Sequence, residues 1–261
     1  MPSLNEQGYL LAAGKVLEYA FCGSPGATGP VIVLVHEGLG CCAMWKNFPK
    51  QLASACNLPV LSYSRSGYGR SEGAGLPWPV SYMHDEALLT LPALLEAAGR
   101  TEAILVGHSD GASIAAMYAG SPKCTGVRGL VLMAPHFFVE EISLKSIETA
   151  RKLYEQGDLK KGLEKYHGIN TDEAFHGWNG VWLNPDFRGW NITSYLEAIK
   201  VPVLALQGVD DQYGTTAQLE AVTQYCGASA ETHLLENCGH SPHHDQSEKS
   251  LEVIANFVAQ L

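Results

Sequence analysis

The residues of this chain best suited to chemistry gather around one serine. Ser109 stands between Gly107 and Gly111, where the apolar run 103–106 gives way to a helix-like pattern of small residues. Two glycines at this spacing are typical of a strand that turns sharply into a helix, because larger side chains would collide with the backbone there. Such a turn holds the serine hydroxyl above the end of a sheet, at the positive end of the helix. The pattern predicts that Ser109 is a nucleophile.

A serine hydroxyl needs a base to activate it, and that base needs an anion to fix its tautomer. His240 follows the last strand-like run, and the adjacent Asp210 and Asp211 follow the run before it. Only one of two neighbours at a strand end can face the histidine, since successive side chains point in opposite directions. The order serine, acid, histidine is the order found with this kind of turn. The sequence therefore supplies a complete set of nucleophile, base and acid.

Strands and helices alternate along most of the chain and would position these residues. Strands are expected at 31–35, 58–63, 103–106, 127–133, 201–206 and 231–235, after a hairpin at 9–13 and 16–21, and the continuous apolar runs 31–35, 103–106 and 127–133 are expected to be buried. Helices are expected at 43–55, at 81–98 with Ser81 as its cap, at 216–225 and at 246–261. This alternation predicts a mostly parallel sheet with helices on both faces. Ligands of such sheets bind beyond the carboxyl ends of the strands, where Ser109, Asp211 and His240 all fall.

The alternation stops after residue 136. From 137 to 190 there is no strand-like run, only helix-permissive segments at 140–156 and 159–166, and three of the five tryptophans fall near its end, at Trp178, Trp182 and Trp190. We expect a helical cap over one end of the sheet, which leaves 1–136 and 191–261 as the core domain. The tryptophans would either pack inside the cap or line a substrate cavity, and Trp178 and Trp182 are our candidates for substrate binding.

The composition limits the partners of the protein. The 261 residues are 46% hydrophobic, and 17 basic against 27 acidic residues give a formal charge of −10. This charge argues against nucleic acid and against anionic membranes, so a small neutral or apolar acyl substrate is expected. Residues 1–9 lack a basic segment followed by an apolar run, and no stretch approaches the roughly 20 apolar residues of a membrane span. We therefore expect a cytoplasmic protein, either a monomer or a homodimer.

Neither the cysteines nor the clustered histidines predict a cofactor. The seven cysteines are scattered through a chain too large to need disulfide bonds, so reduced thiols are expected. The run His240, His243, His244 and Asp245 has the residue types of a metal site. Pro242 and the helix that starts beside it would send these side chains in different directions. We expect no metal and no other cofactor.

The chain resembles the α/β-hydrolase superfamily over nearly all of its length. The resemblance rests on His36-Glu37-Gly38-Leu39-Gly40 before the first helix, the serine turn 107–111, the helical cap, the run 208–211 and Gly239-His240. It implies an eight-stranded, mostly parallel sheet flanked by helices. It also implies an oxyanion hole made by the backbone N–H groups of Gly38 and Asp110. The family spacing from Gly208 favours Asp211 over Asp210 as the acid.

Two residues depart from the family pattern. Glu37 replaces the glycine that follows the histidine, and a carboxylate aimed at the oxyanion would oppose catalysis. We expect Glu37 to form an ion pair with Arg65, on the neighbouring loop, and so to brace the oxyanion loop. Ser64 stands where relatives with an Asp-Arg-x-Gly-x-Gly-x-Ser loop carry aspartate, and its role is left open.

Two further histidines lie close to the expected site in the sequence. His108 directly precedes the serine and is expected to be packed or hydrogen-bonded beneath the turn. His136 leaves a strand end just where the cap begins, so it is our third candidate for a substrate contact.

These residues predict a serine hydrolase that cleaves a small carboxylic ester through an acyl-enzyme intermediate, with His240 as base and Asp211 as its acid partner. The superfamily uses the same residues on lactones, thioesters, amides and carbon–carbon bonds, and fold alone does not choose among these. A carbon–carbon bond hydrolase or a lactonase is therefore an alternative. A second alternative, of another class, is a receptor-like protein that binds its ligand and turns it over little.

Overall fold

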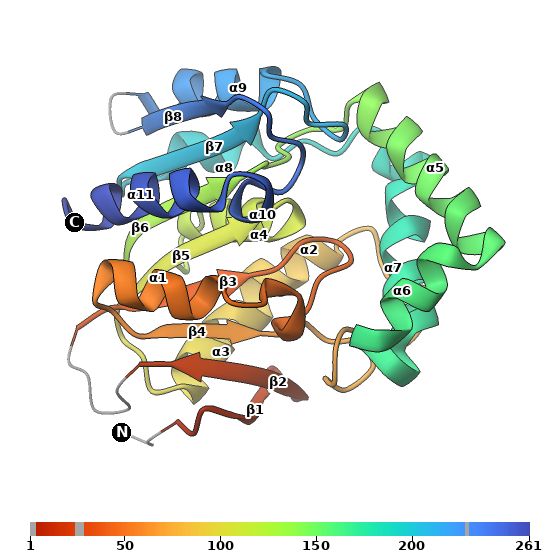
Figure 1. Cartoon of the computed structure of the whole chain (residues 1–261), viewed down its shortest axis with the longest axis horizontal. Helices are drawn as coiled ribbons and strands as arrows, with labels where there is room; N and C mark the ends of the chain where they lie inside the picture. Colours follow the sequence, from red (N-terminus) through yellow and green to blue (C-terminus); the bar gives the residue numbers. More distant parts are fainter. Residues whose placement is uncertain (1–3, 24–28, 228–229) are drawn as a thin grey trace.

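A computed structural model of the chain describes residues 4–23, 29–227 and 230–261, and a single eight-stranded sheet forms its centre (Figure 1). The strands lie in the order β1-β2-β4-β3-β5-β6-β7-β8. Their bounds are β1 Gln7–Ala12, β2 Lys15–Cys22, β3 Val31–Val35, β4 Val60–Tyr63, β5 Ala103–His108, β6 Val127–Met133, β7 Val203–Gly208 and β8 Ala230–Leu235. β2 is antiparallel to β1 and to β4, and the other neighbours are parallel. The expected α/β-hydrolase fold, with its mostly parallel sheet and N-terminal hairpin, is confirmed.

Helices bury both faces of the sheet, as the lack of alternation in the central strands predicted. In β3, Val31, Val33 and Val35 belong to one hydrophobic cluster and Ile32 and Leu34 to the other, because successive side chains point to opposite faces. α1 (Phe48–Cys56) and α11 (Ser247–Val258) cover the second cluster. α3 (Leu91–Ala97), α4 (Asp110–Ala119), α8 (Thr193–Ala198) and α9 (Ala217–Cys226) cover the first. The central strands are thus covered on both faces, which leaves their ends accessible for a functional site.

Two expected helices are broken, each near a proline. In place of 43–55 there is a 3-10 turn at Cys42–Trp45, a break at Lys46 with φ 51°, and then α1, with Pro49 in its first turn. In place of 81–98 there are α2 (Tyr82–Asp85), a π-turn at Glu86–Thr90, and α3, again with a proline, Pro92, in its first turn. Proline lacks an N–H and clashes with the preceding turn, so neither could sit inside one regular helix. Ser81 does not cap the backbone as predicted, and its hydroxyl bonds Asp85 instead.

Three helices between β6 and α8 stand at the carboxyl ends of the parallel strands, α5 (Glu141–Gln156), α6 (Asp158–His167) and α7 (Thr171–Trp182) (Figure 1). The two ends of this segment meet. Phe138 and Asn191 form an isolated antiparallel bridge, and the N–H of Ile192 donates to the carbonyl of Phe137 at 2.7 Å. The helical content of 137–190 agrees with the expected cap, and the division into two domains at these residues stays a prediction.

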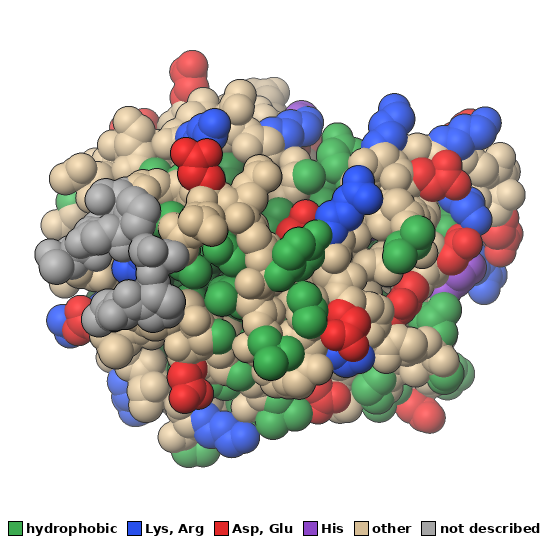
Figure 2. All heavy atoms as spheres, turned by 90° about the horizontal axis from the view of Figure 1, so that it is seen from below, with side chains coloured by type: hydrophobic (Ala, Val, Ile, Leu, Met, Phe, Trp, Pro, Cys, Tyr) green, Lys and Arg blue, Asp and Glu red, His purple; other side chains and the backbone are tan. Residues whose placement is uncertain are grey.

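One outer edge of the sheet is β1, which belongs to the face that Figure 2 shows. Its side chains alternate between partly buried and exposed, with Tyr9 59% and Leu11 68% exposed. Hydrophobic side chains lie between charged ones on this face. Tyr9 and Leu11 belong to the antiparallel edge of the sheet, outside its parallel part. Among the described residues, the longest and most apolar helices still fall short of what a membrane crossing requires.

Candidate active site

Ser109 occupies the strained turn between β5 and α4 that its flanking glycines predicted. Its backbone has φ 53° and ψ −120°, a conformation that side-chain-bearing residues rarely adopt. Both glycines are required by close backbone approaches. A Cβ on Gly111 would overlap the carbonyl oxygen of Val35, and one on Gly107 would overlap the carbonyl of Gly111. The turn can therefore be this tight only with glycine at both positions.

The structure brings Ser109, His240 and Asp211 together from three different loops. His240 Nε2 lies 2.9 Å from Ser109 Oγ, and His240 Nδ1 lies 2.8 Å from Asp211 Oδ1. A carboxylate can only accept, so Nδ1 carries the proton and Nε2 is left free to accept the serine proton. Asp210 is exposed, whereas Asp211 is buried against the histidine. Of the two candidate acids, only Asp211 contacts the base.

Further donors fix the carboxylate of Asp211. Its Oδ1 accepts from the N–H of Tyr213 at 2.8 Å, and its Oδ2 accepts from Gln207 Nε2 at 3.3 Å. Burial raises the pKa of this carboxyl, but the hydrogen bond and charge of His240 outweigh it, so the pKa is lowered. Asp211 is therefore an anion at neutral pH, and its carboxylate holds the His240 ring in place.

Gly38 and Asp110, the expected oxyanion donors, both border the cavity that contains Ser109. Gly38 follows β3, and Asp110 is the first residue of α4, where the N–H groups have no partner within the helix. Within the described part of the chain, no backbone carbonyl accepts from either N–H. The two N–H groups are thus free to meet an anion, and the dipole of α4 favours negative charge at this point.

The side chain of Asp110 lies beneath the turn and is fully enclosed. Its Oδ2 accepts from the Tyr82 hydroxyl at 2.5 Å, and its Oδ1 accepts from Trp182 Nε1 at 3.2 Å. The guanidinium of Arg65 is 3.9 Å away. Burial raises the pKa of this carboxyl, and Arg65 opposes the rise. Because its N–H belongs to the candidate oxyanion hole, this network also fixes one of the two donors.

The expected ion pair between Glu37 and Arg65 is wrong. Arg65 Nη2 donates to the backbone carbonyl of Glu37 at 2.8 Å, and its carboxylate partner is Asp110. The Glu37 carboxylate lies instead 3.4 Å from His108 Nδ1. The sequence placed both charges on neighbouring loops correctly, but it contained no sign that the side chain of Glu37 turns toward the serine strand while its carbonyl turns toward Arg65.

His108 links Glu37 to the base, as well as lying beside the turn as expected. Its Nε2 donates to the backbone carbonyl of His240 at 2.7 Å, and its Nδ1 faces Glu37. Both ring nitrogens therefore face acceptors, which favours the imidazolium. Burial lowers the pKa of His108, but Glu37 outweighs it and the pKa is raised. Burial likewise raises the pKa of Glu37, and His108 more than reverses this, so the negative charge of Glu37 is balanced by His108.

The carboxylate missing at Ser64 is supplied by Glu18, on β2, which sequence reasoning did not find. Glu18 Oε2 accepts from the Ser64 hydroxyl at 2.6 Å and from the N–H of Arg70 at 2.9 Å. The Ser64 hydroxyl also accepts from the N–H of Cys42 at 3.0 Å. A shorter side chain at 64 thus leaves space for a carboxylate from the neighbouring strand, a relation that only the pairing of β2 with β4 creates.

The cavity over Ser109 has a volume of about 180 Å³ and is bordered by both the sheet and the helical segment. Trp178, Trp182 and Ile147 form its helical side, and His136 forms part of its base. Burial, with the charge of His240 second, lowers the pKa of His136 to about 3, so this imidazole is neutral. All three residues expected to contact the substrate border the cavity. Trp190 does not, and it stacks on Phe187 instead.

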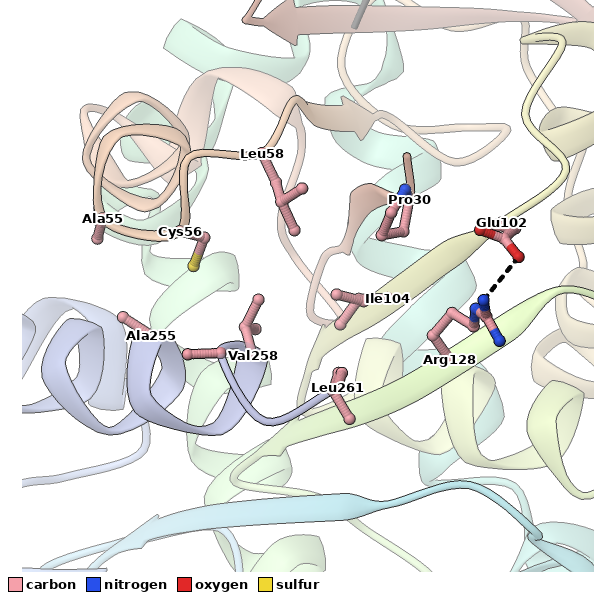
Figure 3. A pocket seen from close by; sticks show the side chains of 11 residues that line it. Pro30, Ala55, Cys56, Leu58, Glu102, Ile104, Arg128, Ala255, Val258 and Leu261 are labelled. Atoms are coloured by element: carbon pink, nitrogen blue, oxygen red, sulfur yellow. Dashed lines mark ion pairs between the residues drawn. The ribbon is translucent and has the colours of Figure 1, made fainter. Parts of the chain in front are cut away.

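A second cavity, at the amino ends of the strands, has a volume of about 330 Å³ (Figure 3). Its side chains are mainly apolar, among them Ile104, Val258 and Leu261, with the ion pair of Glu102 and Arg128 at 3.0 Å on one side. Its eleven lining residues include no serine or histidine. Ser109, Asp211 and His240 lie at the opposite end of the sheet. Across the residues that the structure describes, no group of three or more His, Cys, Asp or Glu side chains is arranged to hold a metal ion.

Known proteins are similar to this chain in sequence or in fold. The model of the Alpha/beta hydrolase family matches residues 32–253. A proline iminopeptidase of Saccharolobus solfataricus is 26% identical over 301 residues, which cover 99% of this chain and 94% of that protein. The enol-lactonase from Burkholderia xenovorans LB400 matches with a TM-score of 0.75 at 18% identity, over 97% of this chain and 100% of that one. The esterase RhEst1 from Rhodococcus sp. ECU1013 matches with a TM-score of 0.74 at 18% identity, over 98% and 100%. This chain is a member of the alpha/beta hydrolase family.

Proposed function

We propose that this protein is a serine hydrolase that cleaves small carboxylic esters through a covalent acyl-enzyme. The observation that carries the proposal is the continuous hydrogen-bonded chain from Ser109 Oγ through His240 to Asp211, with spacings of 2.9 and 2.8 Å. The lowered pKa of Asp211 gives this residue the negative charge that its role requires. Ser109 is the nucleophile, His240 the general base and Asp211 the anion that orients it.

In the acylation step, the Ser109 oxygen attacks the ester carbonyl carbon while its proton passes to His240 Nε2. The carbonyl oxygen becomes an oxyanion, and the N–H groups of Gly38 and Asp110 are free to donate to it. The tetrahedral intermediate then expels the alcohol, which takes the proton from His240 Nε2. Water attacks the acyl-enzyme in the second half of the cycle, again through His240, and releases the acid.

The cavity favours a small, uncharged acyl group. Its volume of about 180 Å³ lies below the roughly 300–1,000 Å³ of typical ligand pockets. The carboxylates on its border are Glu37 and Asp110, and both are already paired, with His108 and Arg65. No carboxylate is thus left to meet a cationic substrate, whereas the indole rings of Trp178 and Trp182 suit an apolar chain.

These features also favour an ester or a lactone over a peptide with an amino-terminal proline. The relatives bear the names of a proline iminopeptidase, an enol-lactonase and an esterase, so the family likeness by itself leaves the bond open. The nitrogen of an amino-terminal proline is a secondary amine that is protonated at neutral pH, so it would need an unpaired acceptor beside the cavity. The proposal therefore places esters first and cyclic esters second.

The test combines active-site labelling with a substrate series. A fluorophosphonate probe is expected to label the wild-type protein once, at Ser109, and not to label Ser109→Ala. Nitrophenyl esters from acetate to octanoate, a small lactone, a diketone and proline nitroanilide are then compared by kcat/KM. The expected result is fastest turnover of acetate to butyrate. Absence of labelling at Ser109 refutes the proposal. Labelling with negligible turnover of every substrate favours a receptor, and turnover of the diketone alone favours a carbon–carbon bond hydrolase.

A further inference from the structure

Arg65 has contacts that neither its place in the sequence nor the proposed reaction accounts for. It follows β4 and is only 2% exposed, so its charge is almost wholly removed from water. Its Nη2 donates to the backbone carbonyl of Glu37 at 2.8 Å and lies 3.9 Å from Asp110 Oδ2. Burying a guanidinium costs several kcal/mol unless partners compensate it, which makes its placement here a specific feature of the fold.

The carbonyl of Glu37 and the N–H of Gly38 belong to one peptide unit. A trans peptide is planar, and its C=O and N–H point in opposite directions. A cation that holds the carbonyl on one side therefore fixes the direction of the N–H on the other side. It also polarises the unit, because hydrogen bonds in series strengthen one another in a low-dielectric interior. The N–H so oriented belongs to Gly38, a residue that borders the cavity over Ser109.

A second donor to the same carbonyl supports this arrangement. The N–H of Arg65 donates to His36 Nε2 at 3.0 Å, so the proton of His36 is on Nδ1. That Nδ1 lies 2.7 Å from the carbonyl of Glu37. The carbonyl thus accepts two hydrogen bonds, and both depend on Arg65, one through its side chain and one through its backbone.

Arg65 also acts on the other half of the oxyanion hole. Its ion pair with Asp110 joins the bonds from Tyr82 and Trp182 in fixing the residue whose N–H is the second donor. The buried cation of Arg65 therefore contacts the residues that provide both donors. An oxyanion is stabilised by the fixed direction of the two N–H groups and by the positive charge of Arg65.

We propose that Arg65 is a positioning residue of the oxyanion hole, which orients and polarises the Glu37–Gly38 peptide and anchors Asp110. The proposal rests on the function proposed above. It predicts a specific kinetic effect, because Arg65 stabilises the oxyanion of the transition state and not the bound substrate. Loss of this contribution lowers kcat and leaves substrate binding in the ground state unchanged.

The test uses Arg65→Lys, which keeps the charge but loses the planar fork, and Arg65→Gln, which keeps a donor but loses the charge. Arg70→Lys, an exposed arginine in the same loop, is the matched control. Titration with the fluorophosphonate gives the concentration of active sites. The rate of nitrophenyl butyrate hydrolysis is divided by this concentration to give kcat. Inhibition by butylboronic acid, which forms a tetrahedral adduct, is compared with inhibition by butyrate.

Both Arg65 variants are expected to lose about tenfold to a hundredfold in kcat, since loss of a whole oxyanion donor costs about 10²–10³. Boronic acid binding should weaken by the same factor, while KM and butyrate inhibition change less than twofold and Arg70→Lys matches the wild type. Arg65→Gln leaves the Asp110 carboxylate without its cationic partner. The double variant Arg65→Gln/Asp110→Asn removes this carboxylate as well, and it is compared with Asp110→Asn alone. The role of Arg65 is overturned if kcat of the single variants stays within twofold of the wild type and kcat of the double variant stays within twofold of Asp110→Asn. It is also overturned if the affinities for boronic acid and for butyrate decrease by the same factor. Failure of the wild type itself to label at Ser109 overturns the proposed function as well.

Discussion

Replacement of Asp211 by asparagine tests the site most directly, because the structure predicts which atom faces the base. Asp211 Oδ1 accepts from His240 Nδ1, and from the N–H groups of Tyr213 at 2.8 Å and Gly214 at 3.3 Å. Oδ2 has one donor, Gln207 Nε2. An asparagine that keeps its oxygen at the Oδ1 position loses one hydrogen bond, and the reverse orientation loses three. We therefore expect Asp211→Asn to preserve the tautomer of His240 and to remove only the negative charge.

The size of the effect follows from the distance and the burial of the pair. The side chain of Asp211 is 1% exposed and that of His240 is 11% exposed, so water screens them little. Two unit charges about 4 Å apart interact by about 4 kcal/mol at an effective dielectric constant near 20. This energy stabilises the imidazolium that forms in the transition state. Its loss corresponds to about a thousandfold decrease in kcat/KM.

The assay is steady-state hydrolysis of nitrophenyl butyrate by Asp211→Asn, with Asp210→Asn as the matched control. The control changes the exposed neighbour and should stay within twofold of the wild type. Thermal unfolding of both variants shows whether the fold is intact. If Asp210→Asn is the variant that loses activity, or if both variants retain wild-type kcat/KM, the assignment of Asp211 as the acid and the charge argument both fail.

The structure also predicts the effects of two glycine substitutions and the dependence of stability on pH. Gly38→Ala places a Cβ against the indole of Trp178, so we expect a decrease in stability of about 1–3 kcal/mol and slower turnover, measured by thermal unfolding and ester hydrolysis. Gly111→Ala drives a Cβ into the carbonyl of Val35 and should abolish soluble expression, whereas a folded, active variant would contradict the tight turn. Burial, and secondarily the charge of His108, lowers the pKa of His243 from 6.5 to about 3, so the unfolded chain takes up a proton there that the native chain does not. Stability is therefore lost as the pH falls from 6.5 toward 3, at up to about 1.4 kcal/mol per pH unit, and urea titrations at several pH values should show a shallower slope for His243→Leu.

Local sequence patterns determined the frame of this protein. Apolar runs without alternation predict strands that are covered on both faces, and the runs 31–35, 103–106 and 127–133 became the neighbouring central strands β3, β5 and β6. The glycine spacing around Ser109 predicts the sharp turn, because only glycine fits where backbones approach so closely. Strand ends then determine that the serine, the acid and the histidine meet at one edge. These inferences succeed because each depends on residues within a few positions of one another.

The sequence was less informative where one element had to adapt to another. The helices expected at 43–55 and 81–98 are interrupted near Pro49 and Pro92, where the missing N–H outweighs the apolar periodicity that predicted a regular helix. The role of Glu18 at Ser64 depends on how β2 pairs with β4, which no local pattern contains.

The sequence by itself determined which residues could do chemistry and at which end of the sheet they lie. Only the tertiary structure decided how the charges around them are paired. The sequence predicts an ion pair between Glu37 and Arg65, since they are opposite charges on neighbouring loops. In the folded chain, Glu37 lies with His108, and Arg65 lies with Asp110 and a backbone carbonyl. The physical reason is that a buried charge takes the partners that enclose it in three dimensions, and those partners come from strands and loops far apart in the chain.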